Sequence, residues 1–131
     1  SFMGKKQLFR WPLARAMREL GGIAIDRSSS RNYVPSMVDE FAKRDSFMLT
    51  IAPEGTRSKV ARWKTGFYHI AIQAKVPLVL GLMDYSKKHV GLAGAIWPTG
   101  DYLKDMEKVL EFYQKTTPRH PRQGSVDFGQ L

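Results

Sequence analysis

The chain has 131 residues, enough for one domain with a buried core, and its 43% hydrophobic and 25% charged residues exclude wholesale disorder. It has no cysteine, which excludes disulfides, thiolate zinc sites and a cysteine nucleophile, and its three histidines show no metal-ligand spacing. The formal net charge of +9, with seven basic against two acidic residues within 1–31, favours an anionic partner: nucleic acid, acidic lipid headgroups or phosphorylated small molecules.

The first part of the chain predicts helices and strands in alternation. Residues 8–20 place apolar side chains on one helical face, and two glycines end that helix. The apolar run 21–27 predicts a short strand that ends in charge. Helical spacing then predicts a second helix over 34–44, and the β-rich run 47–53 predicts a buried strand.

The second part begins with a basic loop over 54–66. Residues 67–75 have helical composition, and the near-continuous apolar run 77–85 resembles a strand that is covered on both faces. One or two short strands are expected over 89–98, broken at glycines. Apolar residues at helical spacing predict a final amphipathic helix over 101–116.

This alternation predicts an α/β domain with a mixed, largely parallel sheet flanked by helices, over residues 1–117. Residues 118–131 are rich in Pro, Arg and Gly and are expected to form a loosely ordered tail. Because no run of about 18 apolar residues occurs, we expect a cytoplasmic protein whose membrane contact is peripheral. The basic, aromatic helix at 8–20 either lies on an anionic membrane or packs into the core. Trp63 either lines a lipid entrance or anchors its loop.

The candidate site lies where predicted strands end, since ligands of α/β sheets collect beyond the carboxyl ends of strands. Arg27 follows one strand, and Glu54 and Arg57 follow the next. Guanidinium groups and backbone N–H groups around Gly55 could hold a phosphate, with the Thr56 hydroxyl as a further donor. The alternative is a solvated loop with a weak surface ion pair.

Three blocks in fixed order decide between these readings: GIAIDR, PEGTRS and PLVLG, at 22–27, 53–58 and 77–81, with matching Lys64, Gly66 and Ala71 between the last two. As a set they resemble the phospholipid/glycerol acyltransferase family, which includes the lysophosphatidic acid acyltransferases. The resemblance covers approximately residues 3–85.

The resemblance implies transfer of a fatty acyl group from acyl-CoA or acyl carrier protein to a hydroxyl of a lysophospholipid or glycerol-phosphate acceptor, at an anionic membrane surface. It implies no metal and no cofactor besides the thioester donor. By the same resemblance, Arg27 and Arg57 hold the acceptor's phosphate, and Glu54 places the glycerol or orients Arg57. Gly55 makes room for the ligand, and Thr56 belongs to the same substrate-binding block.

The chain departs from the family in one respect. The family's general base is the His of an H-x-x-x-x-D block upstream of the first block found here. His69, His89 and His120 are followed five positions later by Ala74, Gly94 and Ser125, so the motif is absent. We therefore assign no catalytic residue, and we expect an N-terminally incomplete acyltransferase that is inactive alone.

Two rival functions stay open. The first is a non-catalytic module that binds anionic lipid or phosphate and lacks the base. The second is a nucleic-acid-binding domain, which only the charge suggests, because aromatic-basic strand patterns and a helix-turn-helix signal are missing. We expect no specific nucleic-acid partner. An H-x-x-x-x-D block in the coding sequence before Ser1 would separate an enzyme from a binding module.

Overall fold

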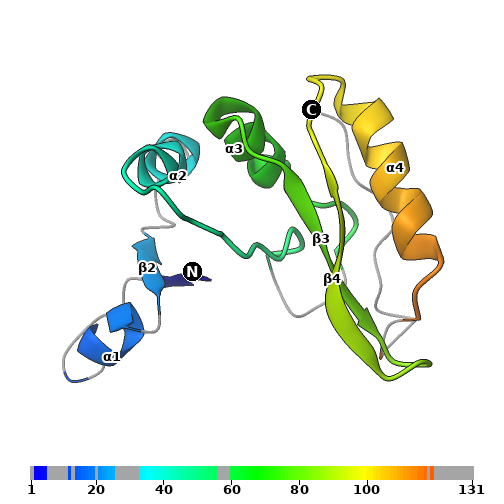
Figure 1. Ribbon diagram of the computed structural model, residues 1–131, viewed down its shortest axis with the longest axis horizontal. Helices are drawn as coiled ribbons and strands as arrows, with labels where there is room; N and C mark the ends of the chain where they lie inside the picture. The colour runs from blue at the N-terminus through cyan, green and yellow to red at the C-terminus, as the bar shows by residue number, and fades with distance from the viewer. Residues whose placement is uncertain are drawn as a thin grey trace. The chain divides into compact units, whose positions relative to one another are not determined.

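A computed structural model of the chain describes residues 2–5, 12, 14–19, 21–25, 33–55, 60–117 and 119. The chain divides into two compact units, Ser1–Ala52 and Pro53–Leu131. Figure 1 labels the helices and strands of both units.

The first unit contains a parallel pair of strands, β1 (Phe2–Lys5) and β2 (Gly22–Ile25). Helix α1 (Ala14–Glu19) lies between them in the sequence. The strand predicted over 21–27 is confirmed, and the described part of the helix predicted over 8–20 is helical. Strand β1 was not predicted, because FMGK is too short to show a period and is defined by its pairing with β2.

Helix α2 (Tyr33–Ala42) confirms the helix predicted over 34–44, and Met37 on its apolar side is buried. The chain after the helix packs back onto it. The Phe47 ring meets the Phe41 ring edge-on, with centroids 4.7 Å apart. The Arg44 guanidinium lies over the Phe47 ring and also forms an ion pair with Glu40 at 2.7 Å.

The strand predicted over 47–53 is wrong, since the structure shows only a single bridge residue there, Thr50. Exposure nevertheless alternates along 47–52, with Phe47, Leu49 and Ile51 less exposed than their neighbours. Such alternation is typical of extended backbone. A strand also needs a row of hydrogen bonds to a neighbour, and an apolar composition does not supply that neighbour.

The second unit is built on an antiparallel hairpin of β3 (Leu78–Asp84) and β4 (His89–Ile96). The connection over 85–88 is too short for a parallel crossover, which needs a dozen or more residues, so the strands must run antiparallel. The strand predicted over 77–85 is confirmed. The region predicted over 89–98 contains one strand, β4, which continues through Gly91, and the break expected at Gly94 is a shift of register at a residue with positive φ.

The carboxylate of Asp84 closes the hairpin turn. It accepts hydrogen bonds from the Ser86 hydroxyl at 2.7 Å, the Ser86 N–H at 3.0 Å and the Lys87 N–H at 3.1 Å. The bond from the Ser86 hydroxyl is the largest of the effects that lower the pKa of Asp84, and they outweigh its burial. The side chain thus satisfies two backbone donors of the turn.

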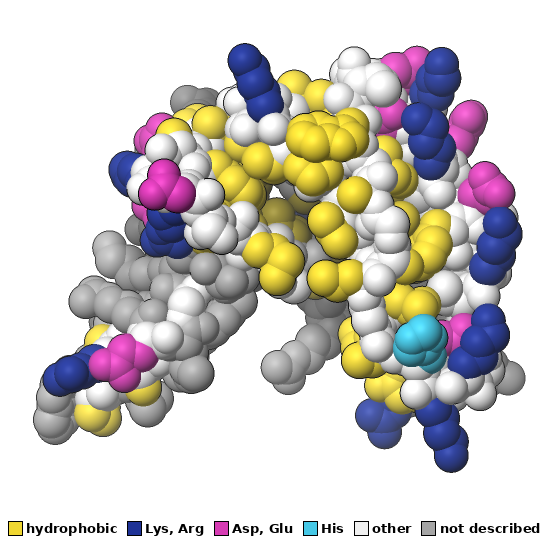
Figure 2. All heavy atoms as spheres, in the orientation of Figure 1, with side chains coloured by type: hydrophobic (Ala, Val, Ile, Leu, Met, Phe, Trp, Pro, Cys, Tyr) yellow, Lys and Arg dark blue, Asp and Glu magenta, His cyan; other side chains and the backbone are white. Residues whose placement is uncertain are grey.

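Two helices pack on one face of the hairpin, α3 (Gly66–Ala74) and α4 (Tyr102–Gln114), and both confirm predicted helices. The buried core joins one residue of α3, one of β3 and three of α4: Tyr68, Leu80, Tyr102, Met106 and Val109. Figure 2 shows hydrophobic side chains on the visible surface over the hairpin.

The other face of the hairpin is exposed. Within the second unit, Val79, Met83, Val90 and Leu92 leave between 46% and 70% of their surface open. The prediction that the strand over 77–85 is covered on both faces is therefore wrong for this unit. A continuous apolar run shows that a strand can be covered, but the neighbour that covers it is not encoded in the run itself.

The order β1, α1, β2, α2, α3, β3, β4, α4 mixes helices and strands along the chain, which is consistent with the predicted α/β class. The described strands form two two-stranded sheets, one parallel and one antiparallel. They do not show the single, largely parallel sheet that we predicted.

Truncation of the core should destabilise the second unit. Met106→Ala removes a side chain that is 2% exposed, and we expect a loss of about 2–5 kcal/mol in the free energy of unfolding. Leu103→Ala, on the same helix but 56% exposed, should cost less than about 0.5 kcal/mol. Urea denaturation followed by circular dichroism measures both, and equal losses would contradict this placement of the core.

Candidate functional site

The candidate site is the loop that leads into α3, described over 53–55 and 60–65. The Lys64 N–H donates a hydrogen bond to the Pro53 carbonyl at 3.0 Å. This bond joins the end of the loop to its beginning. Glu54 and Gly55, two of the predicted site residues, therefore lie at the mouth of a closed loop.

Gly55 is the position where the loop needs a glycine. Its φ is +65°, in the left-handed region that side chains disfavour. A Cβ built on Gly55 would lie 3.2 Å from Nζ and 3.3 Å from Cε of Lys64, closer than ordinary van der Waals contact. The Lys64 side chain therefore extends across the face of Gly55, and any larger residue would have to displace it.

The charge of the Glu54 carboxylate affects the pKa of Tyr113 in α4. Burial, and then the nearby charge of Glu54, raise the pKa of Tyr113. The Tyr113 hydroxyl itself donates a hydrogen bond to the Gly81 carbonyl in β3 at 2.9 Å. Glu54 is partly buried, so its charge lies at the border between the loop and the helix–hairpin core.

Trp63 anchors the loop, the second of the two roles considered for it. Its ring meets those of Phe67 and Tyr113 edge-on, with centroids 6.3 Å and 6.1 Å apart. Trp63 and Phe67 are both partly buried against the core. The residue just before Lys64 is thereby held on α3 and α4.

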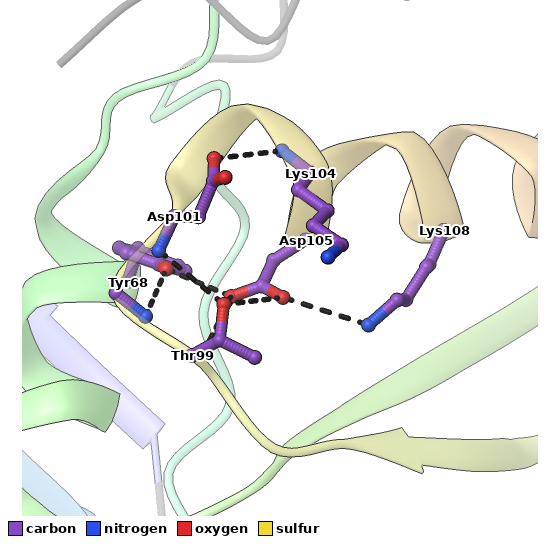
Figure 3. A network of polar contacts seen from close by, with 7 residues as sticks. Tyr68, Thr99, Asp101, Lys104, Asp105 and Lys108 are labelled. Atoms are coloured by element: carbon purple, nitrogen blue, oxygen red, sulfur yellow. Dashed lines mark hydrogen bonds and ion pairs between the residues drawn. The ribbon is translucent and has the colours of Figure 1, made fainter.

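A buried polar network fixes α3, the helix that follows the loop (Figure 3). The Asp105 carboxylate in α4 is 0% exposed and accepts a hydrogen bond from the Tyr68 hydroxyl at 2.8 Å. It also accepts from the Thr99 N–H at 2.6 Å and from the Thr99 hydroxyl at 3.1 Å. The Tyr68 oxygen in turn accepts the Gly100 N–H at 3.1 Å.

The network shifts the pKa values of Asp105 and Tyr68 and thereby determines their protonation states. Burial by itself would raise the pKa of Asp105, but the hydrogen bonds from Thr99 and Tyr68 and the charge of Lys108, 3.7 Å away, lower it overall. Burial, and then the hydrogen bond to Asp105, raise the pKa of Tyr68 to about 12. Near neutral pH the pair is therefore a carboxylate and a neutral phenol.

This network was not predicted from the sequence, although the sequence holds a signal for it. Asp105 follows Tyr102 by three positions and precedes Val109 by four, so it falls on the apolar face of the last helix. An acid on such a face needs buried donors, because an unpaired buried charge is costly. The pattern shows that donors are needed but not that Tyr68 and Thr99 supply them.

Of the predicted site residues, the structure places Glu54 and Gly55, while Arg27, Thr56 and Arg57 lie outside the described residues. His69 lies on α3, partly buried, and no Asp or Glu of the described segments is within ion-pair distance of it. His89 is exposed at the start of β4.

Neither a metal-binding cluster nor a membrane-spanning helix occurs in the described parts of the chain. No group of three or more His, Cys, Asp or Glu side chains there could hold a metal ion. None of the helices in those parts is long and apolar enough to cross a membrane.

Comparison with known proteins gives a consistent family. The model of the acyltransferase family matches residues 1–80. A 1-acyl-sn-glycerol-3-phosphate acyltransferase of Cocos nucifera is 37% identical over 84 residues, which are 59% of this chain and 27% of that protein. Proteins of the same name from Limnanthes douglasii and Salmonella typhimurium are 34% identical over 83 residues and 32% identical over 97 residues.

The Limnanthes match covers 59% of this chain and 30% of that protein, and the Salmonella match covers 69% and 39%. The chain thus spans between 27% and 39% of the length of these relatives. No solved structure matches it significantly.

The requirement for glycine at position 55 is testable. Gly55→Ala should cost about 1 kcal/mol or more in the free energy of unfolding, because alanine disfavours positive φ and its Cβ would push against Lys64. Gly81→Ala is the matched control, since nothing lies within 4 Å of its Cβ position. Urea denaturation of both variants checks this, and a neutral Gly55→Ala would contradict the backbone conformation of the loop.

The Asp105 network should make stability depend on acid. Because folding lowers the pKa of Asp105, its stabilisation is complete above the ordinary Asp value of about 3.9 and is lost as pH falls through the lower folded value. Asp105→Asn should lower the free energy of unfolding by about 1–3 kcal/mol at pH 7, and its difference from the wild type should become smaller towards pH 2. Urea denaturation at a series of pH values measures the free energy of unfolding of the wild type, of Asp105→Asn and of the exposed control Glu107→Gln. A difference between wild type and Asp105→Asn that does not change with pH would refute the prediction.

Proposed function

The chain belongs to the acyltransferase family, and from this premise we propose that its 131 residues bind the phosphate of a lysophospholipid or glycerol-phosphate acceptor. The donor in this proposal is acyl-CoA or acylated carrier protein. The acceptor hydroxyl attacks the thioester carbonyl and gives its proton to a general base as the C–O bond forms. The C–S bond then breaks, and the donor leaves as a thiolate that takes up that proton to become the free thiol. No metal or further cofactor takes part in the proposed reaction.

The observation that carries the proposal is the PEGTRS block at 53–58, which lies within the family match and opens the closed loop. Gly55 has no side chain of its own between its backbone and a phosphate oxygen, and the flexible Lys64 side chain is the group that lies over it. Arg27 and Arg57 are the proposed guanidinium ligands, and Thr56 is the proposed hydroxyl donor. Glu54 is proposed to place the glycerol or to orient Arg57.

In this proposal the chain binds the phosphate of the acceptor but does not remove the proton from the acceptor's hydroxyl. An alcohol is too weak an acid to attack a thioester efficiently unless a base takes its proton. The 131 residues contain no H-x-x-x-x-D motif, and His69 has no carboxylate partner among the described residues. We therefore assign the base to a segment outside these residues and expect them to be inactive alone.

We place the proposed function at the cytoplasmic face of an anionic membrane, with the protein bound peripherally. The net charge of +9 supports this, because cytoplasmic leaflets attract basic surfaces through their anionic lipids. The basic composition of residues 8–20 supports the same placement.

A second candidate function is a non-catalytic module for anionic lipid or phosphate. The absence of H-x-x-x-x-D from the 131 residues favours it. The coding sequence before Ser1 separates the two candidates. The motif there supports the enzyme, and its absence supports the module.

The chain should bind a soluble short-chain lysophosphatidate, measured by calorimetric titration, and should show no acyl transfer when acyl-CoA is added. We expect binding without transfer because the proposed phosphate ligands belong to these residues, whereas the proposed base does not. Absence of binding would overturn the phosphate site. Robust turnover that His69→Ala abolishes would overturn the assignment of the base to another segment.

A further inference from the structure

We propose that Lys64 is a further ligand of the acceptor's phosphate and favours acceptors that end in a phosphomonoester. This inference rests on the proposed function and adds a residue that the sequence analysis treated only as a matching position. Lys64 lies six positions beyond the PEGTRS block, and the fold of the loop brings it back to that block.

The first step is geometric. The Lys64 ammonium nitrogen lies 3.2 Å from the place a Gly55 Cβ would occupy, with Cε and Cδ at 3.3 Å and 3.4 Å. The side chain therefore runs over the one residue of the block that has no side chain. A phosphate oxygen that approaches the Gly55 backbone meets the ammonium at the same place.

The second step concerns charge. Lys64 is exposed, and no carboxylate of the described residues is within ion-pair distance of its ammonium. Glu54 is only ten positions away along the chain, yet its charge acts on Tyr113 and it forms no ion pair with Lys64. The positive charge beside Gly55 is thus available to an anionic ligand.

The third step is the restraint on the Lys64 backbone. Its N–H bonds to the Pro53 carbonyl, and the preceding Trp63 is held between Phe67 and Tyr113. Helix α3 begins at Gly66, and Tyr68 ties that helix to Asp105. A ligand group that is held before binding loses less conformational freedom when it binds.

The chemistry selects the ligand class. An ammonium group offers three donors and one full charge. A phosphomonoester carries a charge between −1.5 and −2 near neutral pH, because its second pKa is about 6. A cation in addition to the proposed Arg57 ligand would therefore stabilise a phosphomonoester more than a phosphodiester, which carries one negative charge.

The test compares the binding of three soluble short-chain lipids to the 131-residue chain: lysophosphatidate, lysophosphatidylcholine and a monoacylglycerol. Lys64→Met keeps the apolar stem and removes the charge, and it should weaken lysophosphatidate binding about tenfold. Its effect on the two other lipids should be less than about twofold, because neither presents a phosphomonoester. Lys64→Arg should restore most of the affinity.

Lys104→Met, at an exposed lysine on α4 of the same unit, is the matched control and should bind lysophosphatidate like the wild type. Thermal unfolding shows whether the variants keep the fold, and Lys64→Gln serves as a second neutral variant. If the wild type binds and both neutral variants bind equally well, the inference about Lys64 is overturned while the proposed function stands. If the wild type does not bind lysophosphatidate, the proposed function itself falls.

Discussion

The second unit depends on one buried carboxylate. Asp105 has no exposed surface, and an ionised group in that position is costly unless donors surround it. Its donors come from α3, through Tyr68, and from the segment after β4, through Thr99. A single charge on α4 therefore fixes a helix and the end of a hairpin relative to each other. Apolar packing alone would tolerate small shifts that these directional bonds do not.

The order that Asp105 creates extends to the candidate site. Because α3 is fixed, the loop that precedes it has a fixed end, and Trp63 and the Lys64 N–H hold that end against the core and against Pro53. Tyr113 adds a second connection. Its hydroxyl donates a hydrogen bond to the Gly81 carbonyl, and burial and then the nearby charge of Glu54 raise its pKa. Glu54 and Lys64, two of the charged residues in the described part of the loop, thus interact with different neighbours.

Features that depend on local sequence could be predicted. Helices α2, α3 and α4 have apolar residues at helical spacing, and strands β2 and β3 are short apolar runs that end in charge or a turn. Features that depend on a distant neighbour could not. Residues 47–53 have the composition of a strand but form none, and the outer side of β3 is apolar but exposed.

The same distinction applies to the site. Glu54 and Gly55 could be predicted as site residues because the block that contains them is contiguous in sequence; the structure places both in the loop, and their roles stay predictions. The approach of Lys64 to Gly55 was not found, because it depends on the Pro53–Lys64 hydrogen bond that folds the loop back. No residue pattern between positions 55 and 64 encodes that closure, and only the backbone path shows it.

Binding of the acceptor and proton transfer are separable in the proposed reaction, and the ligands proposed for this chain serve the first. A phosphate is the end of the acceptor that does not react, so its ligands hold the acceptor without touching the hydroxyl that attacks. That binding accelerates transfer only if a base stands at the hydroxyl while the phosphate is held. In this proposal, the loop closed by the Lys64–Pro53 hydrogen bond, with the Lys64 side chain over Gly55, would meet the first requirement. The second requires a proton acceptor whose position relative to that loop is equally fixed.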